Sequence, residues 1–333
     1  MPGKRKTLAE AGEYEFIRHI RGMMPRDGGT IVRSVGDDCL VVKSPPRKNI
    51  LLTTDTFVEH VHFSRDYADY RQIGSRCMTA AVSDIAAMAG FPVYSLVSLS
   101  LPRTLVFNDA VALFSGLQKT AEFYDCPVAG GETTSSPGPS TITITVIGIC
   151  SPSKAILRSG AKPGDSIYVT GTVGDAMGGL LAFQRGEEGY AFLKEKFLAP
   201  TAQVTLARSL AEIYRLTALI DLSDGIATDL THICEESRCG AEIFKEALPI
   251  SPELRDICNK QELSTVEFAL CAGEDFGLLF TANDKSLGSS FRFMNQPVTR
   301  IGQIHDKASG IMLQSPDGTS HPLTTKGYEH FRT

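Results

Sequence analysis

A stretch rich in proline and glycine near the middle of the chain constrains the fold more than any other feature. Residues 151–165 contain two prolines and two glycines, which interrupt helices and strands. The chain has 333 residues, a length that is long for one hydrophobic core and natural for two. The sequence therefore predicts an N-terminal domain over residues 1–150 and a C-terminal domain over residues 151–333.

The hydrophobic pattern on both sides of this stretch mixes helices and strands. Apolar residues at helical spacing predict helices over 13–24, 70–89, 108–123, 174–184, 201–215 and 226–236. Short apolar runs predict strands at 40–42, 50–53, 93–101, 127–129, 141–150, 166–170, 218–222, 268–270 and 278–281, with a last strand pair around the turn at 316–318. Because strands and helices do not alternate strictly, an α+β fold is favoured over a doubly wound α/β sheet.

Composition and charge exclude several classes of protein. Hydrophobic residues make up 42% and charged residues 21% of the chain, as in globular proteins. The net charge of −5 argues against a nucleic-acid surface, which needs an excess of Lys and Arg. The sequence has neither the roughly 18 apolar residues of a membrane span nor the apolar run of a secretory signal. The eight cysteines form no CxxC pair, so buried reduced thiols in a cytoplasmic protein are predicted.

Acidic residues in short clusters, most of them at the ends of predicted strands, indicate the chemistry. The clusters are GDD at 36–38, TTDT at 53–56, SD at 83–84, GGETT at 130–134, DLSDG at 221–225 and ED at 274–275, with Asp229 within a predicted helix. Neither GxxxxGK[ST] nor a GxGxxG after a strand is present. Magnesium prefers hard oxygen ligands, and two or three such ions neutralise a triphosphate without a Walker lysine. The sequence therefore predicts an enzyme that handles ATP through Mg²⁺ held by these acids.

Each cluster taken alone has a simpler explanation. An Asp or Ser between a strand and a helix is most often a helix N-cap, and Ser223 or Asp224 is placed to cap a helix that begins at Ile226. Asp-Gly is also common in turns. Asp84 is harder to explain in this way, because an acid within VSDIAAMAG is costly to bury without a cation or a hydrogen-bond partner.

The motifs follow one another in a fixed order over almost the whole chain. They are GDD at 36–38, TTDT at 53–56, His62, VSDIAAMAG at 82–90, GGETT at 130–134, RSGAKPGDSIYVTGTVGDA at 158–176, DLSDGIATDL at 221–230, AGEDFGLLF at 272–280 and KGYEHF at 326–331. Together they resemble the thiamine-monophosphate kinase family. Single motifs such as SDG are shared with aminoimidazole-ribonucleotide synthetase, selenophosphate synthetase and hydrogenase-maturation proteins, whereas RSGAKPGD and KGYEHF are more specific.

The resemblance implies a fold, a reaction and an assembly. The fold is a two-domain α+β / α/β arrangement of the PurM-like type, in which an N-terminal mixed-sheet domain pairs with its twin in a homodimer. The C-terminal α/β domain completes the cleft. The reaction transfers the γ-phosphoryl group of ATP to thiamine monophosphate in the presence of Mg²⁺, giving thiamine diphosphate in the last step of its biosynthesis. Neither nucleic acid nor a membrane is implied as a partner.

The resemblance also assigns roles to residues at matching positions. Metal ligands are Asp38, Asp55, Asp84, Glu132, Asp221 and Asp224, assisted by Thr54; ATP contacts are Thr53, Gly131, Arg158 and Ser223; the thiamine end is held by His62, Glu274 and Tyr328. Asp84, Asp224 and Arg158 act electrostatically, and no general base is expected because the acceptor phosphate oxygen is already anionic. For Tyr328, packing of the tail on the C-terminal domain is an alternative.

Three positions depart from the family pattern. Glu132 stands where the family usually has Asp, Ala272 replaces a glycine of the usual GGED, and Gly277 replaces a glutamate. Two other functions are considered: an ATP-dependent ligase that activates a carbonyl oxygen of a different acceptor, and a non-catalytic scaffold. RSGAKPGD and KGYEHF argue against the ligase. The nearly complete set of acids argues against the scaffold.

Overall fold

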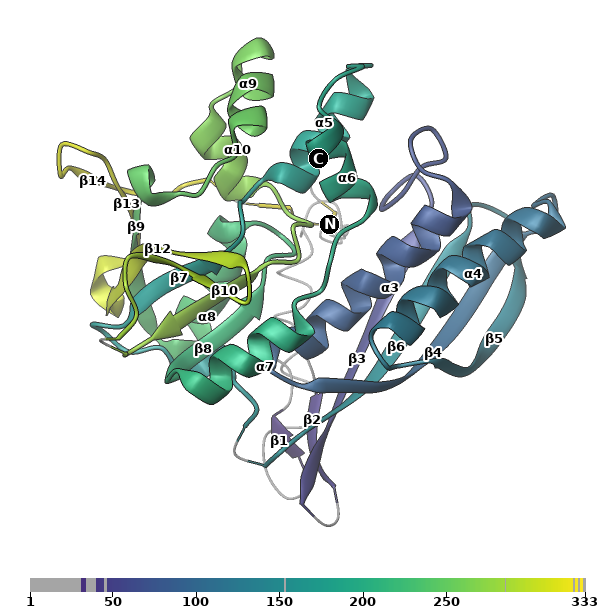
Figure 1. Ribbon diagram of the computed structural model, residues 1–333, viewed down its shortest axis with the longest axis horizontal. Coiled ribbons are helices and arrows are strands. Elements are labelled where there is room, and N and C mark those ends of the chain that lie inside the picture. The colour runs from purple at the N-terminus through teal and green to yellow at the C-terminus, as the bar shows by residue number, and fades with distance from the viewer. Residues whose placement is uncertain are drawn as a thin grey trace, which may run out of the picture.

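Two β-sheets, one in each half of the chain, organise the structure (Figure 1). It is a computed structural model that describes residues 31–33, 40–44, 47–152, 154–284, 286–325, 327–328 and 330–331. The predicted helix over 13–24 and the predicted metal ligand Asp38 lie outside the described residues.

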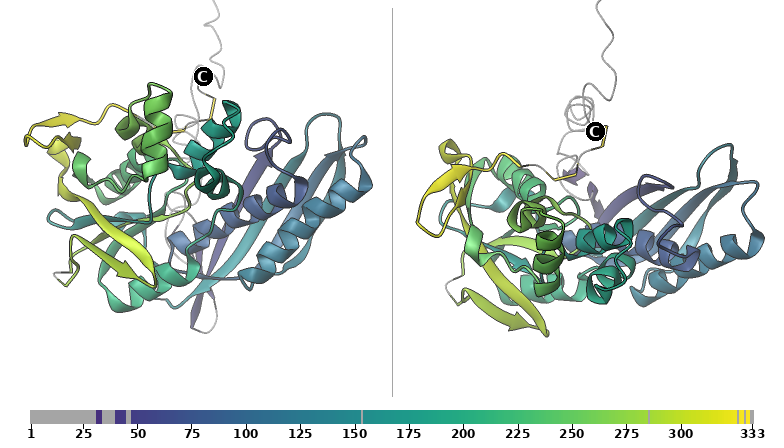
Figure 2. Two further views of the ribbon diagram at one scale, coloured as in Figure 1. Left: turned by 45° about the horizontal axis from the view of Figure 1, so that its top comes forward. Right: turned by 90° about the horizontal axis from the view of Figure 1, so that it is seen from above.

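The first sheet has six strands in the order β1-β2-β3-β6-β4-β5. They are β1 (Ile31–Arg33), β2 (Leu40–Ser44), β3 (Lys48–Val58), β4 (Phe91–Pro102), β5 (Val128–Ser136) and β6 (Thr141–Cys150). Helices α3 (Tyr70–Ala87) and α4 (Phe107–Phe123) cover one face of this sheet (Figures 1 and 2). In β6, buried residues alternate with half-buried ones along the whole strand, beginning with buried Ile142 and Ile144 between half-buried threonines, as expected of a strand with one face on the core.

Helix α3 is fixed at its start and along its length. Asp69 accepts a hydrogen bond from the Gln72 backbone N–H at 2.8 Å, and the Gln72 side chain accepts one from the Asp69 N–H at 2.9 Å, which together form a capping box. Glycines allow α3 and α4 to lie in close contact: a Cβ on Gly74 would overlap the carbonyl oxygen of Leu113, and one on Gly116 would overlap that of Arg71. The helix is therefore held rigidly against both the sheet and α4.

The second sheet has eight strands, in the order β14-β13-β9-β12-β7-β10-β8 with β11 beside β12. They are β7 (Ser166–Thr170), β8 (Leu216–Asp221), β9 (Cys239–Phe244), β10 (Leu278–Ala282), β11 (Ser290–Phe293), β12 (Gln296–Asp306), β13 (Ile311–Gln314) and β14 (Ser320–Pro322). The helices are α5 (Asp175–Gln184), α6 (Ala191–Leu198), α7 (Val204–Ile213), α8 (Ile226–Ser237), α9 (Pro252–Lys260) and α10 (Thr265–Cys271), with 3₁₀ turns η1 (Arg158–Gly160), η2 (Lys245–Ala247) and η3 (Lys307–Ser309).

The two halves share a hydrophobic core around α3. Ile73 and Met78 of α3 belong to the same buried cluster as Leu210 of α7 and Phe280 of β10. A separate cluster, which includes Ile220 and Ile233, lies between the second sheet and α8. Because α3 contacts both sheets, side chains on this helix are placed to reach residues of the C-terminal half.

Most of the predicted elements are confirmed, including the mixed α+β order, but three differences matter. Residues 268–270 were predicted as a strand and lie in α10; such a short apolar run does not distinguish the two, and the Ser264 side chain caps this helix. The sequence analysis did not predict helices α6 and α9 or strands β1, β9, β11 and β12. Strand β5 continues through 130–134, so Glu132 lies within a strand and not after its end.

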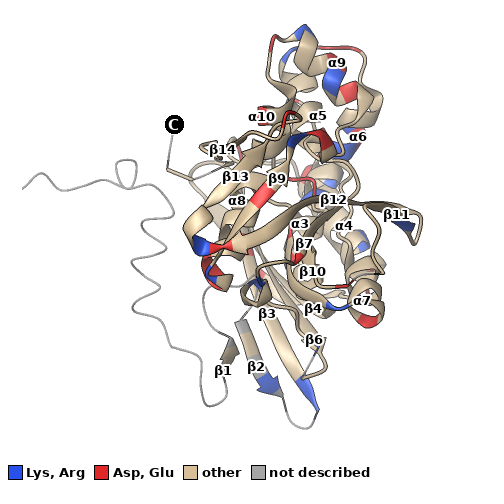
Figure 3. Ribbon diagram, turned by 90° about the vertical axis from the view of Figure 1, so that its left-hand side faces the viewer, with Lys and Arg blue, Asp and Glu red and all other residues tan. Residues whose placement is uncertain are grey.

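No helix among the described residues is long and apolar enough to cross a membrane. In the view of Figure 3, acidic and basic positions are scattered over the ribbon and form no continuous basic stripe along the described residues. Seven cysteines of the described part are free thiols, and six of them are buried, in agreement with the prediction of reduced thiols.

Candidate functional site

A cavity of about 590 Å³ is lined by residues from both halves of the chain. Nine of the residues predicted from the sequence line it: Thr54, Asp55, His62, Asp84, Asp221, Ser223, Asp224, Glu274 and Tyr328. These residues come from β3 and the connection to α3, from α3 itself, from the end of β8 and the segment after it, from the segment before β10 and from the C-terminal tail. The fold therefore brings together groups that are up to 274 residues apart in the sequence, counted from Thr54 to Tyr328.

One part of the cavity wall is formed by β3 and α3. Thr53 and Asp55 alternate with Thr54 along β3, so they point to the face that α3 covers. The Thr53 hydroxyl donates a short hydrogen bond to Asp84. This contact supplies a partner that the apolar surroundings of Asp84 require, and it leaves that carboxylate at the cavity wall. The Thr54 hydroxyl on the other face accepts a hydrogen bond from Thr145 at 3.1 Å.

The end of β8 and the segment after it contribute two more acids. Asp221 is the last residue of β8 and is only 1% exposed. Neither Ser223 nor Asp224 is the N-cap residue of α8, because that position is occupied by Gly225. The helix-cap explanation is therefore wrong for both residues. The Ser223 carbonyl instead accepts a hydrogen bond from the Glu274 N–H at 2.9 Å.

The acids of the cavity have the donor chemistry of a magnesium site. Asp55, Asp84, Asp221 and Asp224 place four carboxylates around one cavity, and like charges in a partly buried site need compensating cations. Among the described residues, no three acidic, His or Cys side chains are gathered around a single ion position. Such a spread set fits Mg²⁺, which binds through one or two carboxylates and completes its octahedron with waters and phosphate oxygens.

Histidines and the C-terminal tail form another part of the wall. The Val58 N–H donates to Nδ1 of His62 at 3.0 Å, so Nε2 carries the hydrogen and faces Nε2 of His330 at 3.4 Å. His330 Nδ1 lies 3.1 Å from the Tyr328 hydroxyl. Burial and, to a smaller extent, the nearby His330 lower the pKa of His62, so His62 is neutral at neutral pH. His330 was not predicted, although KGYEHF contains it.

Glu274 reaches the cavity from a backbone segment with two unusual conformations. Glu274 and Phe276 have positive φ angles of 64° and 47°, which side-chain-bearing residues adopt only when the surroundings enforce them. Asp275 between them supplies that enforcement, since its carboxylate accepts hydrogen bonds from the N–H groups of Gly174 at 2.5 Å and Ala176 at 3.0 Å. The start of α5 thus fixes the segment that carries Glu274.

Glu274 also forms an ion pair that sequence analysis did not predict. Its Oε2 binds Nη2 of Arg76 on α3, and the guanidinium carbon of Arg76 lies 3.7 Å from the centre of the Phe197 ring on α6. Tyr67 packs edge-on against Phe197 at 5.5 Å. This part of the cavity therefore combines one ion pair with several aromatic faces. A charged residue inside the apolar stripe of α3 was the available signal for Arg76.

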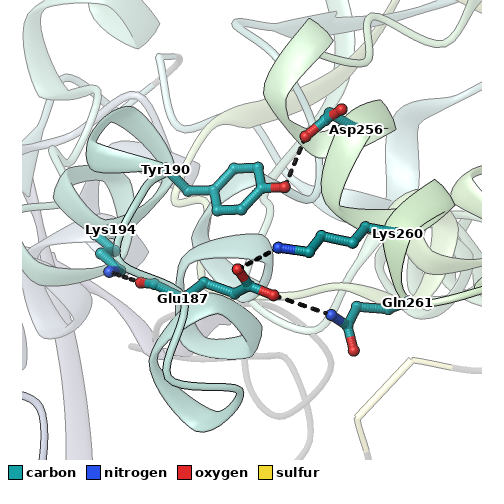
Figure 4. A network of polar contacts seen from close by, with 6 residues as sticks. All are labelled: Glu187, Tyr190, Lys194, Asp256, Lys260 and Gln261. Atoms are coloured by element: carbon teal, nitrogen blue, oxygen red, sulfur yellow. Dashed lines mark hydrogen bonds and ion pairs between the residues drawn. The ribbon is translucent and has the colours of Figure 1, made fainter.

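Helices α5 and α6 form a side wall and are tied to α9 (Figure 4). The carboxylate of Glu187, in the connection between α5 and α6, binds Lys260 at 2.6 Å and Gln261 at 3.3 Å. The Tyr190 hydroxyl donates to Asp256 at 2.6 Å. These exposed contacts are individually weak, but together they connect the hairpin that carries Phe197 to the rest of the C-terminal half.

Apart from Thr53, whose hydroxyl binds Asp84, three predicted residues that the structure describes do not line the cavity. Glu132 is exposed on β5 and pairs with Ser98 of β4. Ser98 pairs with Thr143 of β6, and Thr143 pairs with Thr56 of β3. Three inter-strand spacings place it about 14 Å from Thr56. Its neighbour Gly131 lies in the same strand, where a Cβ would overlap the Val97 carbonyl oxygen.

The third predicted residue that does not line the cavity is Arg158, which lies in η1. The neighbouring Gly160 packs on the Thr217 carbonyl, at the end of β8 opposite to Asp221. The Ser237 hydroxyl donates to the Arg158 carbonyl at 2.7 Å. Within a single chain, the backbone of Arg158 is thus held near the end of β8 that is opposite to Asp221.

The two departures near Glu274 have local explanations. Ala272 ends α10 with φ −74°, a conformation open to any residue, so glycine is not required there. Gly277 is restricted: a Cβ at this position would lie 3.0 Å from the Thr170 carbonyl oxygen.

Asp275 gives the fold a pH dependence. Burial raises the pKa of Asp275 to about 7, so between pH 4 and pH 7 the native state retains a proton that the unfolded state releases. The group therefore makes its whole contribution to the free energy of unfolding below pH 4. This contribution declines by on the order of 4 kcal/mol as the pH rises towards 7.

We expect Asp275→Asn to be less stable than the wild type at pH 4.5, with a smaller difference at pH 7.5. Urea unfolding at both pH values measures the difference in unfolding free energy between the two proteins. A difference that grows with pH would contradict the raised pKa of Asp275.

The order of elements and the cavity define a class of two-domain proteins, and sequence comparison agrees. The family described as AIR synthase related protein, N-terminal domain, matches residues 36–150, and the corresponding C-terminal domain family matches residues 162–313. The chain therefore has the architecture of the AIR synthase-related proteins.

Comparison with characterised proteins identifies one family within this class. The thiamine-monophosphate kinase of Bacillus subtilis is 33% identical over 96% of this chain and 99% of its own length, and that of Aquifex aeolicus is 34% identical over 97% and 99%. A solved structure of AaThiL complexed with AMPPCP and TMP matches with a TM-score of 0.85 and 32% identity, covering 98% of this chain and 99% of that one. The chain belongs to the thiamine-monophosphate kinase family.

Proposed function

We propose that this protein transfers the γ-phosphoryl group of ATP to thiamine monophosphate, giving thiamine diphosphate. One observation carries the proposal: a single cavity is lined by the acids Asp55, Asp84, Asp221 and Asp224 and also by the aromatic and His side chains around Glu274. The family membership and the AMPPCP and TMP bound in the related AaThiL structure support the same pair of substrates. The acidic part suits metal-bound phosphates, and the aromatic part suits a cationic thiazolium ring.

The physical problem of this reaction is the approach of two anions. The acceptor is a phosphate oxygen that is anionic at neutral pH, so catalysis consists of alignment and charge compensation. Acids on β3, α3 and the segment after β8 come from both halves of the chain, and they are therefore placed to bridge two phosphate-bearing molecules through cations. His62, neutral at neutral pH, is not required as a base.

We propose that Mg²⁺ is held by Asp55, Asp84, Asp221 and Asp224, with Asp38 and Thr54 as further predicted ligands. When bound, Mg²⁺ would neutralise charge that develops on the transferred phosphoryl group. Thr53 orients the Asp84 carboxylate by its hydrogen bond. Thr53, Gly131, Arg158 and Ser223 stay predictions as nucleotide contacts, and Glu132 stays a prediction as a metal ligand.

A direct assay tests the reaction. With ATP, Mg²⁺ and thiamine monophosphate, we expect thiamine diphosphate and ADP to form in equal amounts, and we expect EDTA to stop the reaction. Chromatographic detection of both products measures it. ATP hydrolysis without a thiamine product would refute the kinase proposal and favour the ligase-type alternative, in which another acceptor is activated. Absence of any ATP turnover by folded protein would favour the scaffold.

We further propose a homodimer that forms through the open face of the first sheet. On the face opposite to α3 and α4, Tyr94 is 50% and Leu96 is 40% exposed, and Tyr94 pairs with the half-buried Ile147 of β6. An apolar patch on a sheet face is typical of a contact surface. Glu132 and Thr56 lie on this face, so a second copy would enclose both.

The assembly is tested by one charge substitution. Leu96→Glu should convert a dimer of twice 36.0 kDa into a monomer, because a carboxylate would be buried in an apolar contact. Light scattering measures the mass. Phe123→Glu is the control, since Phe123 is 74% exposed on α4, away from the proposed contact. An unchanged dimer in Leu96→Glu would place the interface elsewhere.

We propose a cytoplasmic location on the basis of the thiols. Six of the seven described cysteines are buried and all seven are free, as is usual in a reducing compartment. Cell fractionation with an antibody tests this. Recovery of the protein from an oxidising compartment would contradict it.

A further inference from the structure

Arg76 is a buried cation on the helix that also carries Asp84. Its side chain is 9% exposed, which is rare for an arginine without a specific partner. Arg76, Ala80 and Asp84 are spaced by four residues along α3 and therefore share one face of the helix. Ala80 and Asp84 line the large cavity, while Arg76 and Ala80 line a small adjoining one. One rigid helix thus sets Arg76 and Asp84 about 12 Å apart along its axis.

The contacts of Arg76 connect the two halves of the chain at one point. Nη2 binds Oε2 of Glu274, and the guanidinium stacks on the Phe197 ring with 3.7 Å between its central carbon and the ring centre. Stacking of this kind fixes the plane of an arginine fork. The second oxygen of Glu274, Oε1, makes no hydrogen bond with any described residue, and the Glu274 side chain is 31% exposed at the cavity.

We propose that Arg76 is a positioning residue that orients Glu274 towards the cationic ring of the substrate; this inference rests on the proposed function. The guanidinium holds Oε2 and leaves Oε1 directed to the cavity. Because Oε2 is held in this way, Oε1 keeps one direction relative to the ring, and without Arg76 the carboxylate would be able to turn away from it. The ring end is thereby placed at a fixed distance from Asp84, where the phosphate end reacts.

Because Arg76 acts through Glu274 in this proposal, the effects of the two substitutions are coupled, and a double-mutant cycle measures this coupling. We expect Arg76→Gln to lower kcat/KM for thiamine monophosphate at least 10-fold and to leave the KM for ATP within twofold. Glu274→Gln should lower the same kcat/KM. The double variant should be no worse than Glu274→Gln alone. A merely structural role would instead add to the loss from Glu274→Gln or raise the KM for both substrates.

Two further variants complete the experiment. Arg71→Gln is the matched control, because Arg71 lies on the same helix with an exposed side chain and should leave kinetics unchanged. Arg76→Lys retains the charge but not the planar fork, and it should recover part of the lost kcat/KM. Should Arg76→Gln fail to fold, the cycle of Arg76→Lys with Glu274→Gln decides by the same criterion.

The ring charge provides an independent readout. Binding of an analogue with an uncharged five-membered ring should be weakened less by Arg76→Gln than binding of thiamine monophosphate, measured by calorimetry with an ATP analogue present. Equal weakening of both ligands, additive losses in the cycle, or wild-type kinetics in Arg76→Gln would each overturn the proposal. Wild-type protein that forms no thiamine diphosphate would instead refute the proposed function, so the two failures are distinguishable.

Discussion

Asp84→Asn should reduce kcat for thiamine diphosphate formation roughly 100- to 1,000-fold, the size of effect seen when one electrostatic contact to a transition state is removed. Asn has the same shape as Asp and can still accept the hydrogen bond from the Thr53 hydroxyl. The substitution therefore removes a negative charge from the cavity with little change in packing. Product formation at saturating ATP and thiamine monophosphate, over a range of Mg²⁺ concentrations, measures the effect.

The control for this substitution is Asp125→Asn. Asp125 is exposed at the end of α4 and has a φ angle of 57°, a conformation that Asn tolerates well. It should retain full activity and stability. If Asp84→Asn folds with an unchanged melting temperature and wild-type kcat, Asp84 has no part in the metal site, and the electrostatic role rests on the other acids.

Local features of the sequence predicted the parts of the site that depend on neighbouring residues. The helical period predicts the apolar stripe of α3, and Asp84 is a charge that interrupts this stripe. Arg76 interrupts the same stripe eight residues earlier, so the same argument applies to it. Its partner Glu274 is 198 residues away, and no periodicity connects the two.

Errors arose where tertiary contacts determine the outcome. The polar run at 130–134 was read as the end of a strand, yet β5 continues through it because an edge strand with an exposed face accepts polar side chains. Ser223 and Asp224 had the sequence of a helix cap, but their segment is held by Glu274 and Tyr328 instead. Only the folded chain brings these segments together.

Gly273→Ala should strongly reduce activity, although the glycine has no side chain to contribute to the site. A Cβ at this position would overlap the Ser223 carbonyl oxygen and would lie 3.1 Å from the Asp224 Cα. Both obstacles are backbone atoms, which cannot rotate away. The segment that carries Ser223 and Asp224 must therefore move, and a displacement near 1 Å costs about 100-fold in rate when it misaligns reacting groups.

The expected result is a decrease in kcat/KM of at least 100-fold, with a loss of unfolding free energy of about 1–3 kcal/mol from overpacking. Gly138→Ala is the control, because a Cβ there has no atom within 4 Å. Steady-state kinetics and urea unfolding of both variants measure the two effects.

Because Ala272 occupies the preceding position with an ordinary backbone conformation, the demand for glycine comes from contact with the Ser223–Asp224 segment. Wild-type kinetics in a stable Gly273→Ala protein would show that this segment moves without consequence, and that its acids do not require the observed position.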